Sequence, residues 1–413
     1  MNHAHTRFAA LAILATAGAA HAGAGKNLLF YGNSFTYYVW GYGVPEVVAQ
    51  LAVAAGHPAP FLRTSYSGGG ILPDYATQPF HTDAITTSLP PGATWDHVVM
   101  QGHMMEATGE QGYDPADFRS AALQILANVR AHSPAAGAVM FQTWACAWGQ
   151  FYYPVPWPTP LQMHDEVRGN YRLAMADFDL AHGVGAARLA AVGDAVALLG
   201  WDPVWYEPDL FHPNPAMVLL AAMCIYTSIY EEPVCTIEPS FQPPDALATL
   251  LQSQGVGEAQ WRVLTGIADR CAAPQNRRYP GSGDHLLLES STDGGVPTAC
   301  ADKPLTLGSL LQLRMRSLNG RFDAAPCLIV FDPFVTGLPT GPSTQWPEVA
   351  SPTGGAMLLL SAADLTAPLG LTLPMPLTLP GISVRVQGIA LQASAETGNP
   401  LLTATDAHEL IFW

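Results

Sequence analysis

A serine, an aspartate and a histidine occur in the sequence at positions where they could act together in covalent catalysis. Ser34 follows an apolar run and a Gly-Asn pair in "NLLFYGNSFTYY", so it comes directly after an expected strand. Asp209 and His212 are three residues apart in "DLFHP", just before an expected helix. A carboxylate at that spacing can fix the tautomer of an imidazole, which can then take the proton of a serine hydroxyl. Taken alone, each motif also fits a turn or a helix cap.

The segments around these residues indicate a parallel α/β sheet. Short apolar segments bounded by Gly, Pro or Asp predict strands at residues 27–31, 60–66, 95–101, 137–145 and 186–193. Segments with apolar spacings of three and four predict helices at residues 43–56, 115–132 and 163–183. This alternation implies a sheet with helices on both faces, in which ligands bind at the carboxyl ends of the strands. Ser34 is expected at one of those ends.

The character of the chain changes after about residue 239. "PSFQPPD" resembles a linker, and the polar stretch that follows it is compatible with helix. From about Leu305 the chain is rich in Pro and Gly, and short segments such as "CLIVFD" and "ISVRVQGIALQAS" predict strands. We therefore expect a hydrolase-like domain over residues 23–239 and a smaller β-rich, sandwich-like module over residues 240–413.

In combination, "GNSFT" and "DLFHP" resemble blocks one and five of the SGNH/GDSL hydrolase superfamily. The first block resembles that of a bacterial secreted branch with GNSFT in place of GDS, and the likeness covers about residues 27–233. It implies a flavodoxin-like parallel sheet, the SGNH hydrolase fold, and a serine esterase that forms an acyl-enzyme. Ser34 would be the nucleophile, Asp209 the orienting acid and His212 the general base. No cofactor and no metal are expected.

The oxyanion hole is the part of the resemblance that departs from the family pattern. The second block, "TSYSGGGILPD", offers Gly68 as the best match for the glycine donor, with Gly69 close behind. The third block reads "VVMQGHMMEA", with Met104 near the place where the family has an asparagine. Gln101 is our candidate for the replacement donor, since it carries an amide at the strand end. Gly102 and His103 are the alternatives.

The segment "QTWACAWGQFYYPVPWPTP" is unusually aromatic and leaves a strand at the same edge as Ser34. Trp144, Trp148 and Tyr152 are candidates for substrate contacts, because aromatic faces suit sugar rings, aryl groups or polyester chains. The alternative is that these side chains pack inward over the sheet.

The resemblance favours short-chain O-acetyl esters of carbohydrate as substrates, because exported members of this type often act on O-acetylated sugars. Lipid, aryl or polymeric esters acted on by the same mechanism are the alternative. A second alternative, from another class, is a non-catalytic protein that binds carbohydrate or polymer and has kept the fold. The altered third block favours that reading, whereas an intact Ser, Asp and His argue against it.

Charge and hydropathy exclude several kinds of partner. The formal net charge is −16, and Lys26 and Lys303 are the only lysines, which disfavours nucleic acid and anionic lipid. No internal apolar run reaches the roughly eighteen residues of a membrane span. Residues 1–22, with an apolar centre and an Ala-His-Ala site, resemble a signal peptide, although a short membrane anchor is an alternative. We therefore expect a secreted or periplasmic protein.

The cysteine content is compatible with export. There are six cysteines, an even number, which suggests disulfides in an exported protein. Cys224 and Cys235, which are close in sequence, are the expected pair. No CxxC pattern with matching partners occurs, which argues against a zinc cluster.

Overall fold

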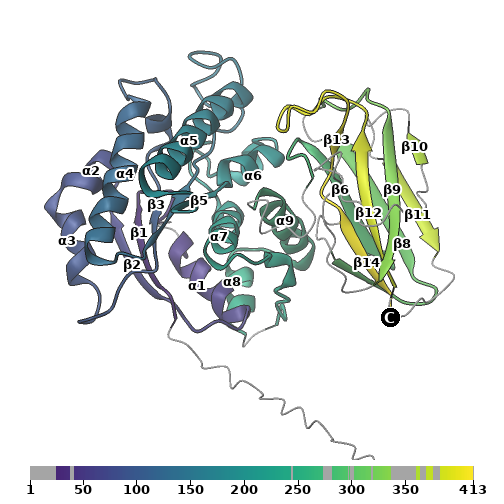
Figure 1. Cartoon of the computed structure of the whole chain (residues 1–413), viewed down its shortest axis with the longest axis horizontal. Helices are drawn as coiled ribbons and strands as arrows, with labels where there is room; N and C mark the ends of the chain where they lie inside the picture. The colour runs from purple at the N-terminus through teal and green to yellow at the C-terminus, as the bar shows by residue number, and fades with distance from the viewer. Residues whose placement is uncertain are drawn as a thin grey trace, which may run out of the picture.

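The computed structural model has two parts, both visible in Figure 1: an α/β part with a parallel sheet and a β-rich part beside it. It describes residues 25–37, 41–242, 245–272, 281–295, 297, 302–317, 320–335, 360–362, 369–374 and 382–412. The expected signal peptide, residues 1–22, lies outside these ranges. No helix within the described ranges is both long and apolar enough to cross a membrane.

Five parallel strands form the sheet of the first part, in the order β2-β1-β3-β4-β5. This is the flavodoxin-like order, which places a crevice at the carboxyl ends of the central strands. The sequence prediction of a doubly covered parallel sheet is confirmed. The strands are β1 (Asn27–Gly32), β2 (Phe61–Tyr66), β3 (His97–Met100), β4 (Gly137–Phe141) and β5 (Ala187–Ala190).

Alternate residues of each strand face opposite layers of helices, as a pleated sheet requires. Leu28 and Phe30 of β1 pack with α1 and α7, whereas Leu29 and Tyr31 pack with α2 and α4. The helices of this part are α1 (Val44–Ala54), α2 (Leu72–Thr77), α3 (Pro79–Thr87), α4 (Pro115–His132), α5 (Pro160–His182), α6 (Val192–Leu198) and α7 (Pro215–Tyr230). Short 3-10 helices are η1 (Met104–Ala107), η2 (Pro203–Trp205) and η3 (Val234–Thr236).

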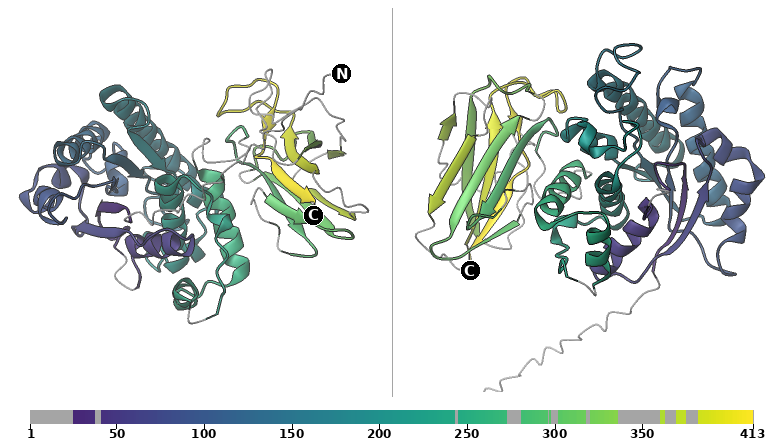
Figure 2. Two further views of the ribbon diagram at one scale, coloured as in Figure 1. Left: turned by 60° about the horizontal axis from the view of Figure 1, so that its bottom comes forward. Right: turned by 180° about the vertical axis from the view of Figure 1, so that it is seen from behind.

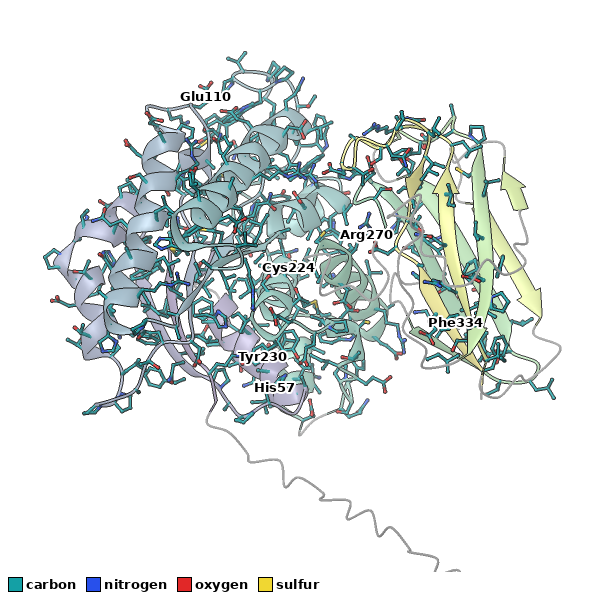
Figure 3. The ribbon with its side chains drawn as sticks, in the orientation of Figure 1. His57, Glu110, Cys224, Tyr230, Arg270 and Phe334 are labelled. Carbon is teal, nitrogen blue, oxygen red and sulfur yellow. The ribbon has the colours of Figure 1, made fainter. Side chains whose placement is uncertain are left out.

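Two further helices belong to the α/β part, which corrects the expected boundary at residue 239. Leu250 of α8 (Ala246–Ser253) and Trp261 of α9 (Glu258–Cys271) lie in the same apolar core as α1 and α7. Figure 3 labels Cys224 on α7, inside the α/β part, and Arg270 on α9, at the side toward the β-rich part. The polar composition after residue 239 concealed this packing, because α9 is apolar on one face only.

The second part is a sandwich of two sheets that is antiparallel apart from one strand pair, as expected. Its strands are β6 (Leu286–Thr292), β7 (Asp302–Leu305), β8 (Leu310–Ser317), β9 (Cys327–Val335), β10 (Leu360–Ala362), β11 (Leu369–Pro374), β12 (Ile382–Ala390), β13 (Thr403–Ala404) and β14 (His408–Phe412). One sheet has the order β10-β9-β12-β14-β7, with β13 paired to β12, and the other has the order β11-β8-β6. Among the described residues of this part, only β14 and β7 pair in parallel. Leu288 and Leu313 from one sheet share a core with Ile329 and Val386 from the other.

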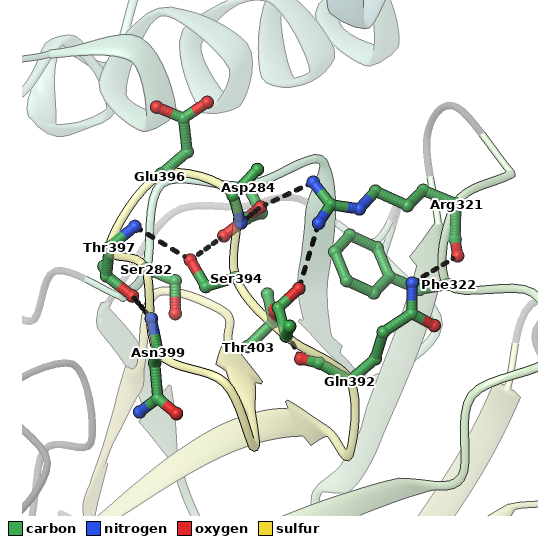
Figure 4. Close-up of polar contacts among 12 residues, drawn as sticks. Ser282, Asp284, Arg321, Phe322, Gln392, Ser394, Glu396, Thr397, Asn399 and Thr403 are labelled. Atoms are coloured by element: carbon green, nitrogen blue, oxygen red, sulfur yellow. Dashed lines mark hydrogen bonds and ion pairs between the residues drawn. The ribbon is translucent and has the colours of Figure 1, made fainter.

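The β-sandwich lies next to α6 and α9 of the α/β part in Figure 1, and the right-hand view of Figure 2 shows the same arrangement from behind. Glu396, on a loop between β12 and β13, accepts hydrogen bonds from Arg168 (2.9 Å) and Arg172 (2.6 Å) of α5. Figure 4 shows how buried Asp284 orders this loop, by accepting from Ser394 Oγ at 2.5 Å. The sandwich is thus attached by oriented ion pairs as well as by the chain itself.

The expected disulfide between Cys224 and Cys235 is not formed. Cys224 is a buried free thiol on α7, and burial raises its pKa. The backbone N–H of Cys235 donates to Asp269 Oδ2 on α9 at 2.9 Å. Closeness in sequence was a poor guide here, because α7 points Cys224 into the core. Cys300 lies outside the described residues.

Candidate active site

The turn after β1 is built so that Ser34 lies at its exposed side. The backbone N–H of Tyr37 donates to the Asn33 carbonyl at 2.9 Å, which closes the turn. Asn33 is buried; its Oδ1 accepts from the N–H of Phe35 (3.1 Å) and its Nδ2 donates to the Gly70 carbonyl (3.1 Å). Gly32 has no room for a Cβ, which would collide with the hydroxyl of Thr36. Each residue of "GNSFT" thus has a part in presenting the serine.

Ser34, His212 and Asp209 form one continuous hydrogen-bonded row. Ser34 Oγ lies 2.8 Å from His212 Nε2, and His212 Nδ1 lies 2.6 Å from Asp209 Oδ2. An ionised carboxylate only accepts, so Nδ1 carries the proton and Nε2 is left to accept from the serine hydroxyl. The structure therefore brings together all three of the residues selected from the sequence.

Asp209 is held in its ionised form by the loop that carries it. Partial burial acts to raise its pKa, but hydrogen bonds from the His212 ring and from the N–H groups of His212 and Phe211 outweigh burial and lower it. The two N–H groups donate to Asp209 Oδ1 at 2.9 and 3.0 Å. One carboxylate oxygen thus orders the loop, and the other orients the imidazole.

The aromatic segment after β4 supports the Asp-His loop through its backbone. Three successive carbonyl oxygens, those of residues 209–211, accept hydrogen bonds from this segment. The donors are the Gln150 amide (2.8 Å), the Ala147 N–H (3.0 Å) and the Trp144 indole N–H (3.3 Å). Leu210, between Asp209 and His212, has a φ of 60°, which is uncommon for a residue other than glycine. These contacts hold the loop in that conformation.

The expected substrate contact of Trp144 is wrong. Its side chain is 0% exposed and packs on Phe35, with 4.8 Å between ring centroids. Trp148 is 48% exposed and Phe151 74% exposed, so both can meet a ligand, and Tyr152 is half-buried beside Phe151. The segment therefore divides into a buried half that supports the Asp-His loop and an exposed half that stays a candidate for substrate contact.

Gln101 is not placed to donate to an oxyanion, which corrects the expected role. Its side chain is fully buried beneath the serine turn, where Oε1 accepts from the N–H of Asn33 (3.0 Å) and the hydroxyl of Thr36 (2.9 Å). A backbone N–H can only donate, so the amide orientation is fixed. The amide nitrogen then donates to the Gly102 carbonyl. Gln101 orders the turn rather than facing a substrate.

Two backbone N–H groups, those of Gly68 and Ser34, stay candidates for oxyanion donors. Gly68 is exposed in the turn after β2, and its N–H has no acceptor among the described residues. The same is true of the N–H of Ser34 within those ranges. Met104, near the family's asparagine position, is fully buried, with its sulfur 4.0 Å from that of Cys146. A side chain in that position cannot serve as a donor.

Glu106 has a buried carboxyl group, and the sequence analysis did not select this residue. It accepts from the N–H of Leu72 at 2.8 Å and from the N–H of His103, so it joins the loop after β2 to the loop after β3. Burial raises its pKa to about 8, against the opposing effect of these two hydrogen bonds. The spacing of a capping box, with Glu three residues after the cap, could have revealed it.

No protein-family model matches the chain, and no curated protein matches its sequence. Solved structures do resemble about half of it. A protein from Slackia heliotrinireducens described as an SGNH hydrolase has 21% identity over 50% of this chain and 99% of its own, with a TM-score of 0.40. The structures found include SGNH and GDSL hydrolases and esterases. This is the superfamily that the two sequence motifs resemble.

The matches from that superfamily differ in substrate. A carbohydrate acetylesterase from Sinorhizobium meliloti has 14% identity over 50% of this chain and 98% of its own, with a TM-score of 0.33. A phospholipase A1 from Streptomyces albidoflavus has 13% identity over 50% of this chain and 98% of its own, with a TM-score of 0.29. Because the identities and scores are low, we argue function from the residues of this chain.

Proposed function

We propose that the protein is a secreted or periplasmic serine ester hydrolase. The observation that carries the proposal is the hydrogen-bonded row of Ser34, His212 and Asp209, with links of 2.8 and 2.6 Å. A serine hydroxyl is a weak nucleophile until a base takes its proton, and this row supplies a base in the required tautomer. Its position at the carboxyl end of β1 is where parallel sheets bind ligands.

The reaction proceeds in two steps. Ser34 Oγ attacks the ester carbonyl carbon while its proton passes to His212 Nε2, and the carbonyl electron pair moves to oxygen. The N–H groups of Ser34 and Gly68 stabilise that oxyanion. The intermediate collapses, the alcohol leaves with the proton from His212, and an acyl-enzyme remains on Ser34. Water, deprotonated by His212, then releases the acid and restores the serine. Asp209 stabilises the imidazolium in both steps.

Short-chain esters of carbohydrate, O-acetyl esters above all, are the proposed substrates. Trp148 and Phe151 offer exposed aromatic faces next to the Asp-His loop, and Tyr152 adjoins them. Such faces stack on the apolar faces of sugar rings. Polymeric, aryl or lipid esters are the alternative, and a net charge of −16 disfavours anionic lipid surfaces. A binding protein without activity is the second alternative, and the replaced third-block asparagine favours it.

The proposal is tested with p-nitrophenyl esters of increasing acyl length and three forms of the protein: wild type, Ser34→Ala and Ser65→Ala. Ser65 is a matched control, because its hydroxyl lies 2.8 Å from His81 Nδ1 but both residues are buried away from solvent. We expect hydrolysis that Ser34→Ala abolishes, that Ser65→Ala retains and that is fastest on acetate. Fastest hydrolysis of long chains would favour the lipid or polyester alternative. No Ser34-dependent turnover on any ester would favour the binding protein.

A further inference from the structure

His103 lies between aromatic rings that belong to the candidate active site. Its imidazole stacks on Phe35, the residue after the nucleophile, with 6.3 Å between centroids and 21° between planes. On Tyr113 it stacks at 5.9 Å and 27°. Its centroid is also 5.9 Å from the ring of Phe211, which directly precedes His212. Because Phe35 and Phe211 each adjoin a residue of the hydrogen-bonded row, the imidazole is held beside that row.

The hydrogen bonds of His103 fix its tautomer. Nδ1 accepts from the backbone N–H of Met105 at 3.3 Å and so caps η1. In a neutral imidazole the nitrogen that accepts carries no proton, so the proton is on Nε2. This Nε2–H has no acceptor among the described residues, and the ring is half-buried rather than enclosed. A donor on the outer edge of the ring is therefore available to a ligand.

His103 also stays uncharged beside His212. Burial lowers its pKa, and the positive charge that His212 gains when it is protonated lowers it further. A neutral imidazole does not compete with His212 as the imidazolium forms, and it can polarise a carbonyl by donating a hydrogen bond.

We propose that His103 is a catalytic residue, whose Nε2–H donates a hydrogen bond to the oxyanion in place of the missing side-chain amide. The inference rests on the proposed esterase function. No proton is transferred by His103: the Ser34 proton goes to His212, and the carbonyl electron pair goes to the oxygen that His103 contacts. Gln101 is committed to the serine turn and Met104 is buried, so neither can supply this donor. In the third block, the proposed donor therefore lies one residue before Met104, the position nearest to the family's asparagine.

The test uses two variants that separate the donor from the cap. His103→Phe keeps an aromatic ring but removes both nitrogens, whereas His103→Asn keeps a side-chain oxygen that can cap η1 and lacks a donor at the position of Nε2. His57→Phe is the matched control, because His57 also stacks on an aromatic ring, that of Tyr230, at 4.5 Å. Figure 3 shows both residues beyond the end of α1, which begins near the serine turn and runs away from it.

We expect kcat on p-nitrophenyl acetate to fall about 100-fold to 1,000-fold in both His103 variants, with KM changed little. The affinity for a trifluoromethyl ketone, which forms a tetrahedral adduct, should fall in parallel, and His57→Phe should behave as wild type. Melting temperatures show whether each variant is folded.

Normal kcat in His103→Asn would assign the residue to the cap alone and overturn the proposal, as would unchanged ketone affinity in both variants. In either case Ser34-dependent hydrolysis by the wild type would leave the esterase function standing. No hydrolysis by the wild type would overturn both.

Discussion

Replacing Gln101 by Leu tests whether this side chain supports the turn that carries Ser34, in addition to its contribution to the stability of the fold. The change keeps the volume of the side chain but removes the oxygen that accepts from the Asn33 N–H and the Thr36 hydroxyl. The site is fully buried, so water cannot take over. A buried donor left without an acceptor costs about 1–3 kcal/mol. The hydroxyl can rotate toward another acceptor whereas the N–H cannot, so one donor is left unsatisfied and we expect a loss of about 1–3 kcal/mol.

Activity should fall as well, because the unsatisfied N–H belongs to the residue before Ser34. A shift of the nucleophile by about 1 Å can cost about 100-fold in rate, so we expect kcat/KM on p-nitrophenyl acetate to fall about 10-fold to 100-fold in Gln101→Leu. Urea unfolding gives the stability, and initial rates at saturating and limiting ester give kcat and KM.

Gln142→Leu is the control. Gln142 is also fully buried at the carboxyl end of a strand, and its amide bonds the N–H (3.0 Å) and Oδ1 (3.1 Å) of Asp194. It should lose stability comparably and lose much less activity. If the two variants lose equal activity, or if Gln101→Leu is fully active, the serine turn does not depend on Gln101 and the reasoning is wrong.

Three other perturbations have defined outcomes. The pKa of Glu106 is about 8 in the folded protein against an ordinary 4.5, so the folded state keeps a proton that the unfolded chain loses, and the free energy of unfolding should fall as pH rises through that interval. Urea titrations at several pH values should show a flatter dependence of this free energy on pH in Glu106→Gln. An equal slope in the two proteins would contradict the raised pKa. Glu396→Gln should lower the free energy of unfolding by about 1–3 kcal/mol, because it weakens the partly buried ion pairs between the two parts. The control Glu258→Gln, which weakens an exposed ion pair, should cost under about 1 kcal/mol. Equal losses measured by calorimetry would argue against docking through Glu396. Trp148→Ala should raise KM for acetylated oligosaccharide more than for p-nitrophenyl acetate, and an equal effect on both would exclude a sugar contact.

The alternation of strands and helices in the α/β part and the three polar residues of the site could be predicted from the sequence, because short local patterns indicate them. Ser34 follows an apolar strand, and Asp209 and His212 share a turn. The resemblance of these two motifs to blocks one and five of the SGNH/GDSL superfamily then selected the three residues together. Bounds were also good for a long helix with regular apolar spacing: the helix expected at residues 115–132 is α4, which Asp114 caps.

The direction in which a side chain points could not be predicted, because the residue type alone does not determine it. Gln101 and Trp144 were both chosen as surface-facing, and both point inward, because each satisfies a backbone group of a loop that is remote in sequence. Cys224 points into the core because α7 is apolar on all sides. The helices after residue 239 were assigned to the wrong part because their polar faces dominate the composition.

The most direct test of the proposed chemistry is covalent capture of the nucleophile. Wild type, Ser34→Ala and Ser65→Ala are incubated with a fluorophosphonate, and intact mass and peptide mapping give the number and the position of adducts. We expect one adduct on Ser34 in the wild type and in Ser65→Ala, and none in Ser34→Ala. An unlabelled wild type, or an adduct that persists in Ser34→Ala, would contradict the assignment of Ser34 as an activated nucleophile.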